Sequence, residues 1–270
     1  MVPKKSLGQH FLLSKEVVDD AIVAGEVSAV DSVLEIGPGN GVLTEALLQK
    51  AGRVIAVEKD DLLIPKLQKK FVSEISSGRL NLINGDILKI RNLKSEISGY
   101  KVIANIPYYI TGAIIKLLLT SKHLPEIIVL LVQKEVGERI VACDGKESIL
   151  SISVKVFGMP TIVREVPRNL FYPEPAVDSV LLKIANIHNP FKNEAEEKSF
   201  FSLVKSGFSA KRKLLLNNLS NTHFSKKELV KIFLDLGIDE KTRAEDVPLE
   251  TWKQIALFRN IERFELPATG

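Results

Sequence analysis

Residues 32–41 are Ser32-Val33-Leu34-Glu35-Ile36-Gly37-Pro38-Gly39-Asn40-Gly41, an apolar strand that runs directly into a glycine-rich loop. A run typical of a helix follows at residues 42–50, and a second apolar strand follows at residues 53–57. A strand, a helix and a strand in this order predict a parallel βαβ unit. We therefore expect the chain to build an α/β fold around residues 32–58.

The glycine-rich loop has the properties of a cofactor site. Gly37, Gly39 and Gly41 let the backbone pass close to a ligand, and the following helix N-terminus offers free N–H groups. Glu58 ends the second strand, 21 residues after Gly37, where it can accept both hydroxyls of a ribose. Dinucleotide sites require a glycine where Val42 stands. The loop therefore suits a nucleoside ligand without a pyrophosphate, and we expect S-adenosylmethionine.

Three further apolar runs predict strands at residues 80–84, 100–104 and 126–133, with helical runs between them. Two more β-rich runs follow at residues 160–166 and 179–184. Together these runs predict a Rossmann-like, mostly parallel sheet with helices on both faces. Asp86 comes just after the strand at 80–84, where it either accepts a hydrogen bond from an adenine amino group or forms a solvated turn.

The strand at residues 100–104 ends in the cluster Asn105-Ile106-Pro107-Tyr108-Tyr109. In open α/β sheets, ligands bind in the crevice outside the carboxyl ends of the strands. Pro107 biases Ile106 toward an extended conformation, so the carbonyl groups of Asn105 and Ile106 stay free as acceptors. The cluster is either part of a binding site or an ordinary strand-to-helix turn with a tyrosine in the core.

The last two β-rich runs are joined by residues 167–176, which include three prolines and two aromatic residues. A loop stiffened by proline can hold Phe171 over the crevice, or Phe171 can anchor the loop in the core. The local sequence does not choose between these positions.

The chain has 270 residues, 45% hydrophobic and 26% charged, which is enough to bury one full core and a second small one. Its single cysteine, Cys143, excludes an internal disulfide framework and a structural zinc site, and we predict no metal. No uninterrupted apolar run approaches the ~20 residues of a membrane span, and the basic N-terminus lacks the apolar core of a signal peptide. We therefore expect a soluble protein of the cytoplasm that does not bind a membrane.

From Asn186 the composition shifts to a polar linker and then to helical periodicity alone. We therefore predict two domains, residues 1–187 with the sheet and residues 188–270 as a small all-helical domain. Between residues 205 and 227 there are six basic residues and no acid, interleaved with aromatic and asparagine side chains. This run is either a solvated face or a contact for RNA phosphates. The predicted RNA-binding residues are Lys205, Lys211, Arg212 and Lys213.

Motifs along nearly the whole chain resemble those of the small-subunit ribosomal RNA adenine N6-dimethyltransferases. They lie at residues 4–12, 34–41, 105–108, 132–136 and 171–179, and residues 208–213, 217–219 and 243–246 extend the match. Several motifs in the right order are far more specific than any one of them.

The resemblance implies a set of cofactor positions. They are His10, Leu12, Gly37, Gly39, Glu58, Asp86 and Asn105. The family usually has asparagine where His10 stands. A histidine can still donate a hydrogen bond to the methionine carboxylate of the cofactor, in a contact that depends on its protonation.

The resemblance also implies the reaction, which is dimethylation of the N6 amino group of two adjacent adenines in small-subunit ribosomal RNA. We expect a monomer that acts on a pre-ribosomal particle during ribosome assembly. The N6 lone pair is delocalised into the ring, so acceptors must hold the N6 hydrogens while the amino group becomes more tetrahedral. We assign this role to the Asn105 side chain and the Ile106 carbonyl, with Tyr108 and Phe171 stacked on the two faces of the base. The expected catalytic residues are Asn105, Ile106, Pro107, Tyr108 and Phe171.

Three alternatives share parts of this pattern. An erythromycin-resistance methyltransferase would use the same core on large-subunit RNA. A protein glutamine methyltransferase would also use an Asn-x-Pro-Tyr cluster, but it would not need the basic helical tail. A non-catalytic ribosome-assembly or transcription factor could retain the fold, although the intact glycine loop, Glu58, Asp86 and Asn105 argue against it.

Overall fold

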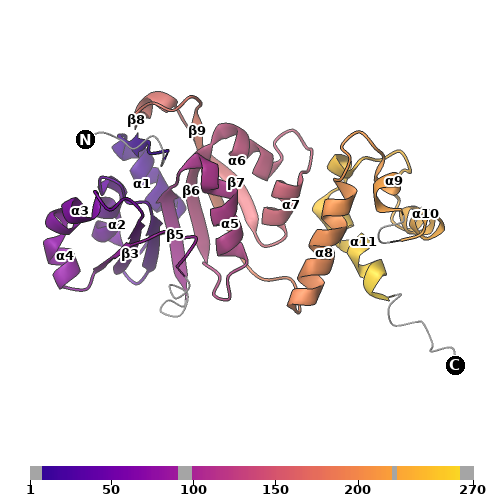
Figure 1. Cartoon of the computed structure of the whole chain (residues 1–270), viewed down its shortest axis with the longest axis horizontal. Helices are drawn as coiled ribbons and strands as arrows, with labels where there is room; N and C mark the ends of the chain where they lie inside the picture. The colour runs from indigo at the N-terminus through magenta and orange to yellow at the C-terminus, as the bar shows by residue number, and fades with distance from the viewer. Residues whose placement is uncertain (1–7, 91–98, 221–223, 262–270) are drawn as a thin grey trace. The chain divides into compact units, whose positions relative to one another are not determined.

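The computed structural model describes residues 8–90, 99–220 and 224–261 and divides the chain into two compact units (Figure 1). Unit 1 comprises Met1–Glu138 and Phe157–His188, and unit 2 comprises Arg139–Val156 and Asn189–Gly270. The predicted domains, 1–187 and 188–270, differ from this division because residues 139–156 belong to unit 2. These residues pair with a segment some hundred positions away, through Lys146 with Glu245 and Asp246 at 3.0 Å each, and no local pattern reveals such a contact.

Unit 1 contains a seven-stranded sheet in the order β4-β3-β2-β5-β6-β9-β7. The five strands from β2 to β6 run parallel, while β9 is antiparallel to both β6 and β7. The predicted mostly parallel sheet is confirmed. The strands are β2 Ser32–Ile36, β3 Arg53–Glu58, β4 Leu80–Asn84, β5 Tyr100–Asn105, β6 Ile127–Gln133, β7 Met159–Val166 and β9 Ser179–Ala185.

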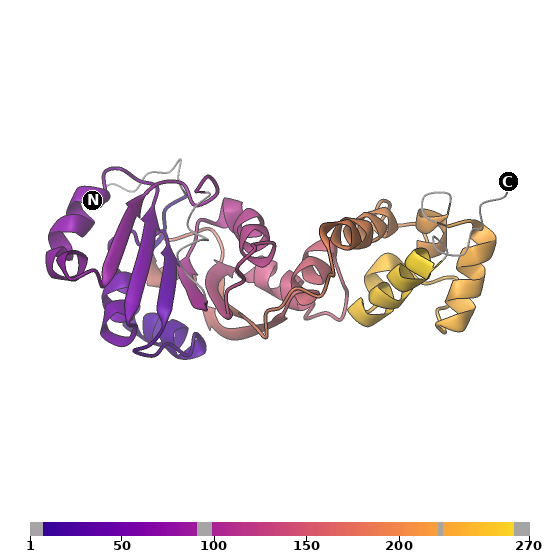
Figure 2. The same cartoon turned by 90° about the horizontal axis from the view of Figure 1, so that it is seen from below.

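Helices cover both faces of this sheet (Figure 2). Successive side chains of a strand point to opposite faces. Val33 and Leu34 are both buried, as are Ile128 and Val129, so each face has a cover. One face packs against α1 and α2 in a single apolar cluster. The helices of this region are α1 Lys15–Ala24, α2 Val42–Lys50, α3 Ile64–Lys70, α4 Val72–Ser76, α5 Thr111–Leu119 and α6 Lys134–Val141, with η2 Tyr108–Ile110 and η3 Arg168–Leu170.

The strand order reverses between β2 and β5. From β2 the chain proceeds outward to β3 and β4, and it then returns to β5 on the other side of β2. β2 pairs with β3 as far as Ile36 opposite Val57, but its pairing with β5 ends at Leu34 opposite Val102. The two strands therefore part before their carboxyl ends, at the switch point where such sheets bind ligands.

Unit 2 is helical in its described residues, as the sequence predicted. Trp252 is fully buried at its centre and stacks on Phe208 with ring centroids 5.8 Å apart. Ser225 and Glu228 form the predicted capping box at the start of α10. The helices are α7 Ile149–Lys155, α8 Glu194–Gly207, α9 Leu215–Leu219, α10 Lys226–Asp235, η4 Ala244–Asp246 and α11 Leu249–Ile261. Among the described helices of the chain, none has both the length and the apolar character required to cross a membrane.

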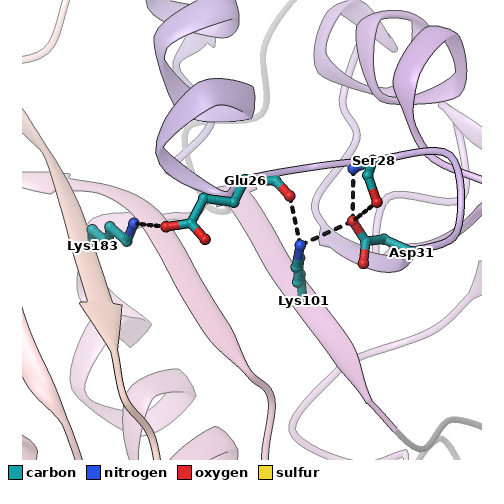
Figure 3. Close-up of polar contacts among 5 residues, drawn as sticks. All are labelled: Glu26, Ser28, Asp31, Lys101 and Lys183. Atoms are coloured by element: carbon teal, nitrogen blue, oxygen red, sulfur yellow. Dashed lines mark hydrogen bonds and ion pairs between the residues drawn. The ribbon is translucent and has the colours of Figure 1, made fainter.

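A buried lysine ties β5 to the turn between α1 and β2 (Figure 3). The Nζ atom of Lys101 donates to the Glu26 carbonyl at 2.6 Å and to Oδ2 of Asp31 at 2.9 Å. Burial acts to raise the pKa of Asp31, but hydrogen bonds from Lys101 and Ser28 outweigh it and the pKa is lowered. Lys183 on β9 pairs with the same turn through the Glu26 carboxylate, which is 64% exposed. The buried pair and the exposed pair therefore differ mainly in their access to water.

Replacing Lys101 by methionine removes the positive charge that pairs with the Asp31 carboxylate in a poorly solvated site. We expect the free energy of unfolding to fall by about 3–5 kcal/mol, the range for breaking a buried ion pair. The matched control is Lys183→Met, which removes an ion pair to an exposed carboxylate and should cost clearly less than loss of the buried pair. Urea unfolding at pH 7 measures the free energy of unfolding of both variants. Equal decreases would contradict a stabilising role for the buried Lys101–Asp31 ion pair.

Candidate functional site

One cavity opens at the carboxyl ends of β2, β3 and β5, and it encloses about 1220 Å³ of space including its open mouth. Glu35, Ile36, Ile103 and Ala104, which lie where β2 and β5 part, form its inner wall. The cavity brings together ten predicted site residues. They are His10, Leu12, Gly37, Gly39, Glu58, Asp86, Asn105, Ile106, Pro107 and Tyr108.

The backbone of the glycine-rich loop adopts conformations that are unfavourable for residues with a side chain. Gly37, Gly39 and Gly41 have φ values of 74°, 58° and 75°, in the left-handed region. A Cβ atom at Gly39 would lie 3.0 Å from the Phe11 ring, and one at Gly41 would lie 2.7 Å from the Phe71 ring. The rings of Phe11 and Phe71 therefore pack against the loop backbone, which lines the cavity at Gly37 and Gly39.

Glu58 fits the predicted ribose-binding role. It is 5% exposed, and its two carboxylate oxygens accept backbone hydrogen bonds from Gly39 at 3.0 Å and Asp60 at 2.8 Å. Burial raises its pKa, against the opposing effect of these hydrogen bonds. A carboxylate has about four lone-pair sites, so each oxygen retains capacity for a hydroxyl. The carboxylate is therefore held in place without being saturated.

Asp86 carries an ion pair that the sequence analysis missed. Its Oδ2 atom lies 3.0 Å from Nζ of Lys59, and its Oδ1 atom accepts from the Leu88 N–H at 3.1 Å. Burial acts to raise the pKa of Asp86, but the hydrogen bonds and charge of Lys59 lower it below its usual value. An adenine amino group would therefore share an ionised carboxylate with Lys59. The sequence signal was available, because Lys59 directly follows Glu58 at the end of a strand.

Glu35 is a second lining residue to which the sequence analysis assigned no role. It is 1% exposed, and neither carboxylate oxygen has a hydrogen bond of ordinary geometry within the described part of the chain. Burial raises its pKa to about 8, against a smaller effect of Thr44. Glu35 is therefore mostly neutral at pH 7. An acid inside the apolar run 33–36 was the signal that could have drawn attention to it.

The Asn105 cluster holds an amide in one orientation. Asn105 lines the cavity, and its Nδ2 atom donates to the His10 carbonyl at 2.9 Å, while Oδ1 has no hydrogen-bond donor among the described residues. Pro107 has φ −59°, and the 3-10 turn η2 follows it. The Tyr108 hydroxyl lies 2.7 Å from Oγ of Ser179, and burial raises the pKa of Tyr108, against the effect of that bond. The arrangement can therefore accept hydrogen bonds from an amino group beside an aromatic ring.

The side chain of His10 is engaged elsewhere than expected. Its Nδ1–H donates to the Pro173 carbonyl at 2.6 Å, and its ring stacks on Tyr108 with centroids 5.6 Å apart. A neutral imidazole with its proton on Nδ1 has only a lone pair on Nε2. With Nδ1–H bonded to Pro173, Nε2 is the ring nitrogen that remains for a ligand, and the ring supports Tyr108.

Phe171 is not among the residues that line the cavity, and its stacking on the base stays a prediction. It is 3% exposed and belongs to the apolar core of unit 1. The reason is the two-stranded ribbon of β1 Phe11–Leu12 and β8 Phe171–Tyr172, in which neighbouring side chains point to opposite sides. Phe171 points inward, while Tyr172 is 59% exposed. Of the two positions left open by the sequence, Phe171 takes the core anchor.

The four predicted RNA-binding residues lie in unit 2. Lys205 is on α8, and Lys211, Arg212 and Lys213 are on the loop before α9; all four are exposed, and within the described residues none forms an ion pair. Asn218 shapes this loop, because its Nδ2 atom donates to the carbonyls of Gly207 at 2.6 Å and Ala210 at 3.1 Å. Two aromatic residues that interleave with these charges in the sequence, Phe208 and Phe224, pack in the helical unit.

Residues 4–7 of the first motif lie outside the described residues. Across residues 8–90, 99–220 and 224–261, there is no cluster of three His, Cys, Asp or Glu side chains able to hold a metal ion.

Comparison with known proteins gives similarities to a family model, to a curated relative and to two solved structures. Residues 2–260 match the family model described as "Ribosomal RNA adenine dimethylase". The chain is 42% identical, over 94% of its length and 87% of the relative's, to "Ribosomal RNA small subunit methyltransferase A" of Dehalococcoides mccartyi strain BAV1. The crystal structure of a dimethyladenosine transferase from Plasmodium falciparum matches with a TM-score of 0.79 at 28% identity, over 94% of this chain and 98% of that one. The crystal structure of the 23S rRNA methyltransferase ErmE matches with a TM-score of 0.76 at 23% identity, over 93% and 99%, and it shows the fold alone.

Replacing Glu58 by alanine removes the acceptor for the ribose hydroxyls. We expect S-adenosylmethionine binding to weaken by about 1.5–3 kcal/mol, the range for hydrogen bonds to a charged group. Asp61→Ala is the matched control, since it removes a neighbouring but exposed carboxylate, and it should bind normally. Calorimetric titration measures both, and an unchanged affinity of the Glu58 variant would remove Glu58 from the site.

Proposed function

This chain belongs to the ribosomal RNA adenine dimethylase family, and we propose that it dimethylates the N6 amino groups of two adjacent adenines in small-subunit ribosomal RNA. The observation that carries the proposal is the Asn105 amide, whose Nδ2 atom is committed to the His10 carbonyl. The Oδ1 atom is therefore left to accept a hydrogen bond in the cavity between the ends of β2 and β5. An amino group is the kind of donor that this acceptor suits.

The residues present fit S-adenosylmethionine as the methyl donor. Glu58 would hold the ribose hydroxyls and Asp86 the adenine amino group, while the open glycine loop leaves room for close approach. S-adenosylmethionine, when bound, supplies an electrophilic methyl group on a sulfonium. Glu35 also lines the cavity, and burial raises its pKa to about 8, which disfavours a negative charge at this position.

The chain's own residues then act on the target base. Asn105 Oδ1 and the Ile106 carbonyl would accept the two N6 hydrogens, which favours the tetrahedral form of the nitrogen. Tyr108 would stack on one face of the base, with its ring fixed by Ser179 at the hydroxyl and by His10 on the opposite side. As the bond from the methyl group to nitrogen forms and its bond to sulfur breaks, the nitrogen gains a positive charge, which these acceptors stabilise. The nitrogen then loses one hydrogen as a proton to water, so no strongly basic side chain is required.

The choice of small-subunit RNA rests on sequence identity. The 42% identical relative is named as a small-subunit methyltransferase, whereas the likeness to ErmE concerns the fold. The non-catalytic alternative gains no support, since the site residues for cofactor and base converge on one cavity. We further propose that the chain acts as a monomer on a pre-ribosomal particle in the cytoplasm. The exposed basic loop 211–213 would contact RNA phosphates, as its charge and lack of ion pairs in the described structure suggest.

The reaction and the role of Asn105 are tested together. The wild-type protein with labelled cofactor should methylate adenines of isolated small subunits and leave large subunits unmodified, as read by mass spectrometry of the RNA. At saturating S-adenosylmethionine, Asn105→Ala should lower turnover by roughly 10²–10³, the scale for removing one transition-state partner. RNA affinity should change little, since phosphate contacts supply most of it. Methylation of large-subunit RNA by the wild type would overturn the function, and a wild-type rate for the variant would reduce Asn105 to a turn residue.

Replacing Lys211, Arg212 and Lys213 together by alanine removes three candidate phosphate contacts. We expect weaker RNA binding and a shallower dependence of affinity on salt, by a slope of about 0.7–0.9 per lost contact, because fewer counterions are released. Cofactor affinity should not change. Lys50, Lys66 and Lys69, exposed on α2 and α3, provide a triple-alanine control with the same change in net charge. If both triple variants shift the slope equally, the loop is an ordinary solvated face.

A further inference from the structure

Tyr109 is an exposed aromatic residue at the rim of the cavity to which the proposed reaction assigns no role. Its side chain is 61% exposed, although the residue lines the same cavity as Asn105 and Tyr108. Its hydroxyl forms no hydrogen bond to any described residue. A large aromatic ring exposed at the rim of a binding site can bury its surface against a ligand.

The backbone that carries Tyr109 is fixed on both sides. The Ile110 N–H donates to the Pro107 carbonyl at 3.2 Å, which closes the 3-10 turn η2. The Thr111 hydroxyl, at the buried start of α5, donates to the Tyr108 carbonyl at 3.1 Å. With the backbone held, only the two side-chain torsions of Tyr109 remain to be ordered, so it can offer contact area at low entropic cost.

The N-terminal segment supports one side of the Tyr109 ring. A Cβ atom at Gly8 would lie 3.4 Å from the Cδ1 and Cε1 atoms of the ring and 3.9 Å from Cβ of Pro107, so the bare backbone of Gly8 lies against the ring. Gly8 has φ 58°, which favours glycine at this contact. The ring is thus supported from one side while most of its surface remains open to solvent.

A base that enters the cavity must leave its stack, and the nucleotide next to it in the strand then loses a stacking partner. This unstacking costs a few kcal/mol unless the protein replaces the lost contact. Because Tyr109 directly follows Tyr108 in the chain, a strand whose target base lies against Tyr108 would bring a neighbouring nucleotide to the rim. Aromatic side chains stack on any base, since every base has a π-face.

We infer that Tyr109 is a positioning residue for RNA, whose ring stacks on the nucleotide that flanks the methylated adenine. This inference rests on the proposed function and adds a second base platform to it. Tyr108 would hold the reacting base and Tyr109 the base next to it. The RNA strand would therefore be held at two successive nucleotides. The tyrosine hydroxyl has no part in this contact.

The test compares Tyr109→Leu with Tyr109→Phe in methylation of small ribosomal subunits that lack the modification. The leucine variant should lower kcat/KM for RNA by on the order of 5- to 150-fold, the loss expected for one base stack. Its KM for S-adenosylmethionine should equal that of the wild type, and the phenylalanine variant should behave as wild type in both. Tyr172→Leu is the matched control, because Tyr172 is 59% exposed but does not line the cavity, and it should leave both constants unchanged.

A direct readout uses 2-aminopurine placed beside the target adenine in an RNA fragment of the small subunit. Its fluorescence should be quenched on binding to the wild-type and phenylalanine proteins, and this quenching should be lost with leucine. The inference is overturned if the leucine variant keeps the wild-type kcat/KM, if the KM for S-adenosylmethionine rises instead, or if phenylalanine fails as leucine does. A wild-type protein that methylates no RNA would overturn the proposed function itself.

Discussion

The site depends on the early separation of β2 from β5. Their backbone pairing ends at Leu34 and Val102, whereas β2 stays paired with β3 to its last residue. Parallel strands that part in this way leave their carboxyl ends facing an opening that neither neighbour can fill. The glycine loop after β2 and the Asn105 cluster after β5 therefore face each other, although 68 residues separate Gly37 from Asn105.

Three carboxylates share this opening in different electrostatic states. Asp86 is kept ionised by Lys59, and Glu58 is buried but bonded to two backbone N–H groups. Glu35 lies deeper, and its pKa of about 8 makes it mostly neutral at pH 7. Burial therefore disfavours the charged form of Glu58 and Glu35, whereas Lys59 favours the charged form of Asp86. Desolvation sets this pattern. Burial disfavours the charged form of each acid, and hydrogen bonds or opposite charges that replace water favour it.

The polar and aromatic residues around Asn105 support one another. The His10 carbonyl orients the Asn105 amide, and the His10 ring packs on Tyr108. The Tyr108 hydroxyl is in turn bonded to Ser179 on β9. These contacts join an N-terminal segment, a central strand end and an antiparallel strand. A change at any one of them would therefore alter how the acceptor and the ring are presented to a base.

The sequence by itself determined the elements and the chemistry at their ends. The alternation of apolar runs with helical runs predicted the sheet, and Glu58, Asp86 and Asn105 were found because each lies at or just after the end of a strand. Local patterns suffice here, since the carboxyl ends of parallel strands meet at one edge. Only the tertiary structure decided the positions that depend on contacts between distant segments. It placed Phe171 in the core, gave Asp86 an ion pair with Lys59, bound the His10 ring to Pro173, and joined residues 139–156 to the helical unit. Each of these follows from packing between segments far apart in the chain, and such packing leaves no periodic trace in the residues that take part.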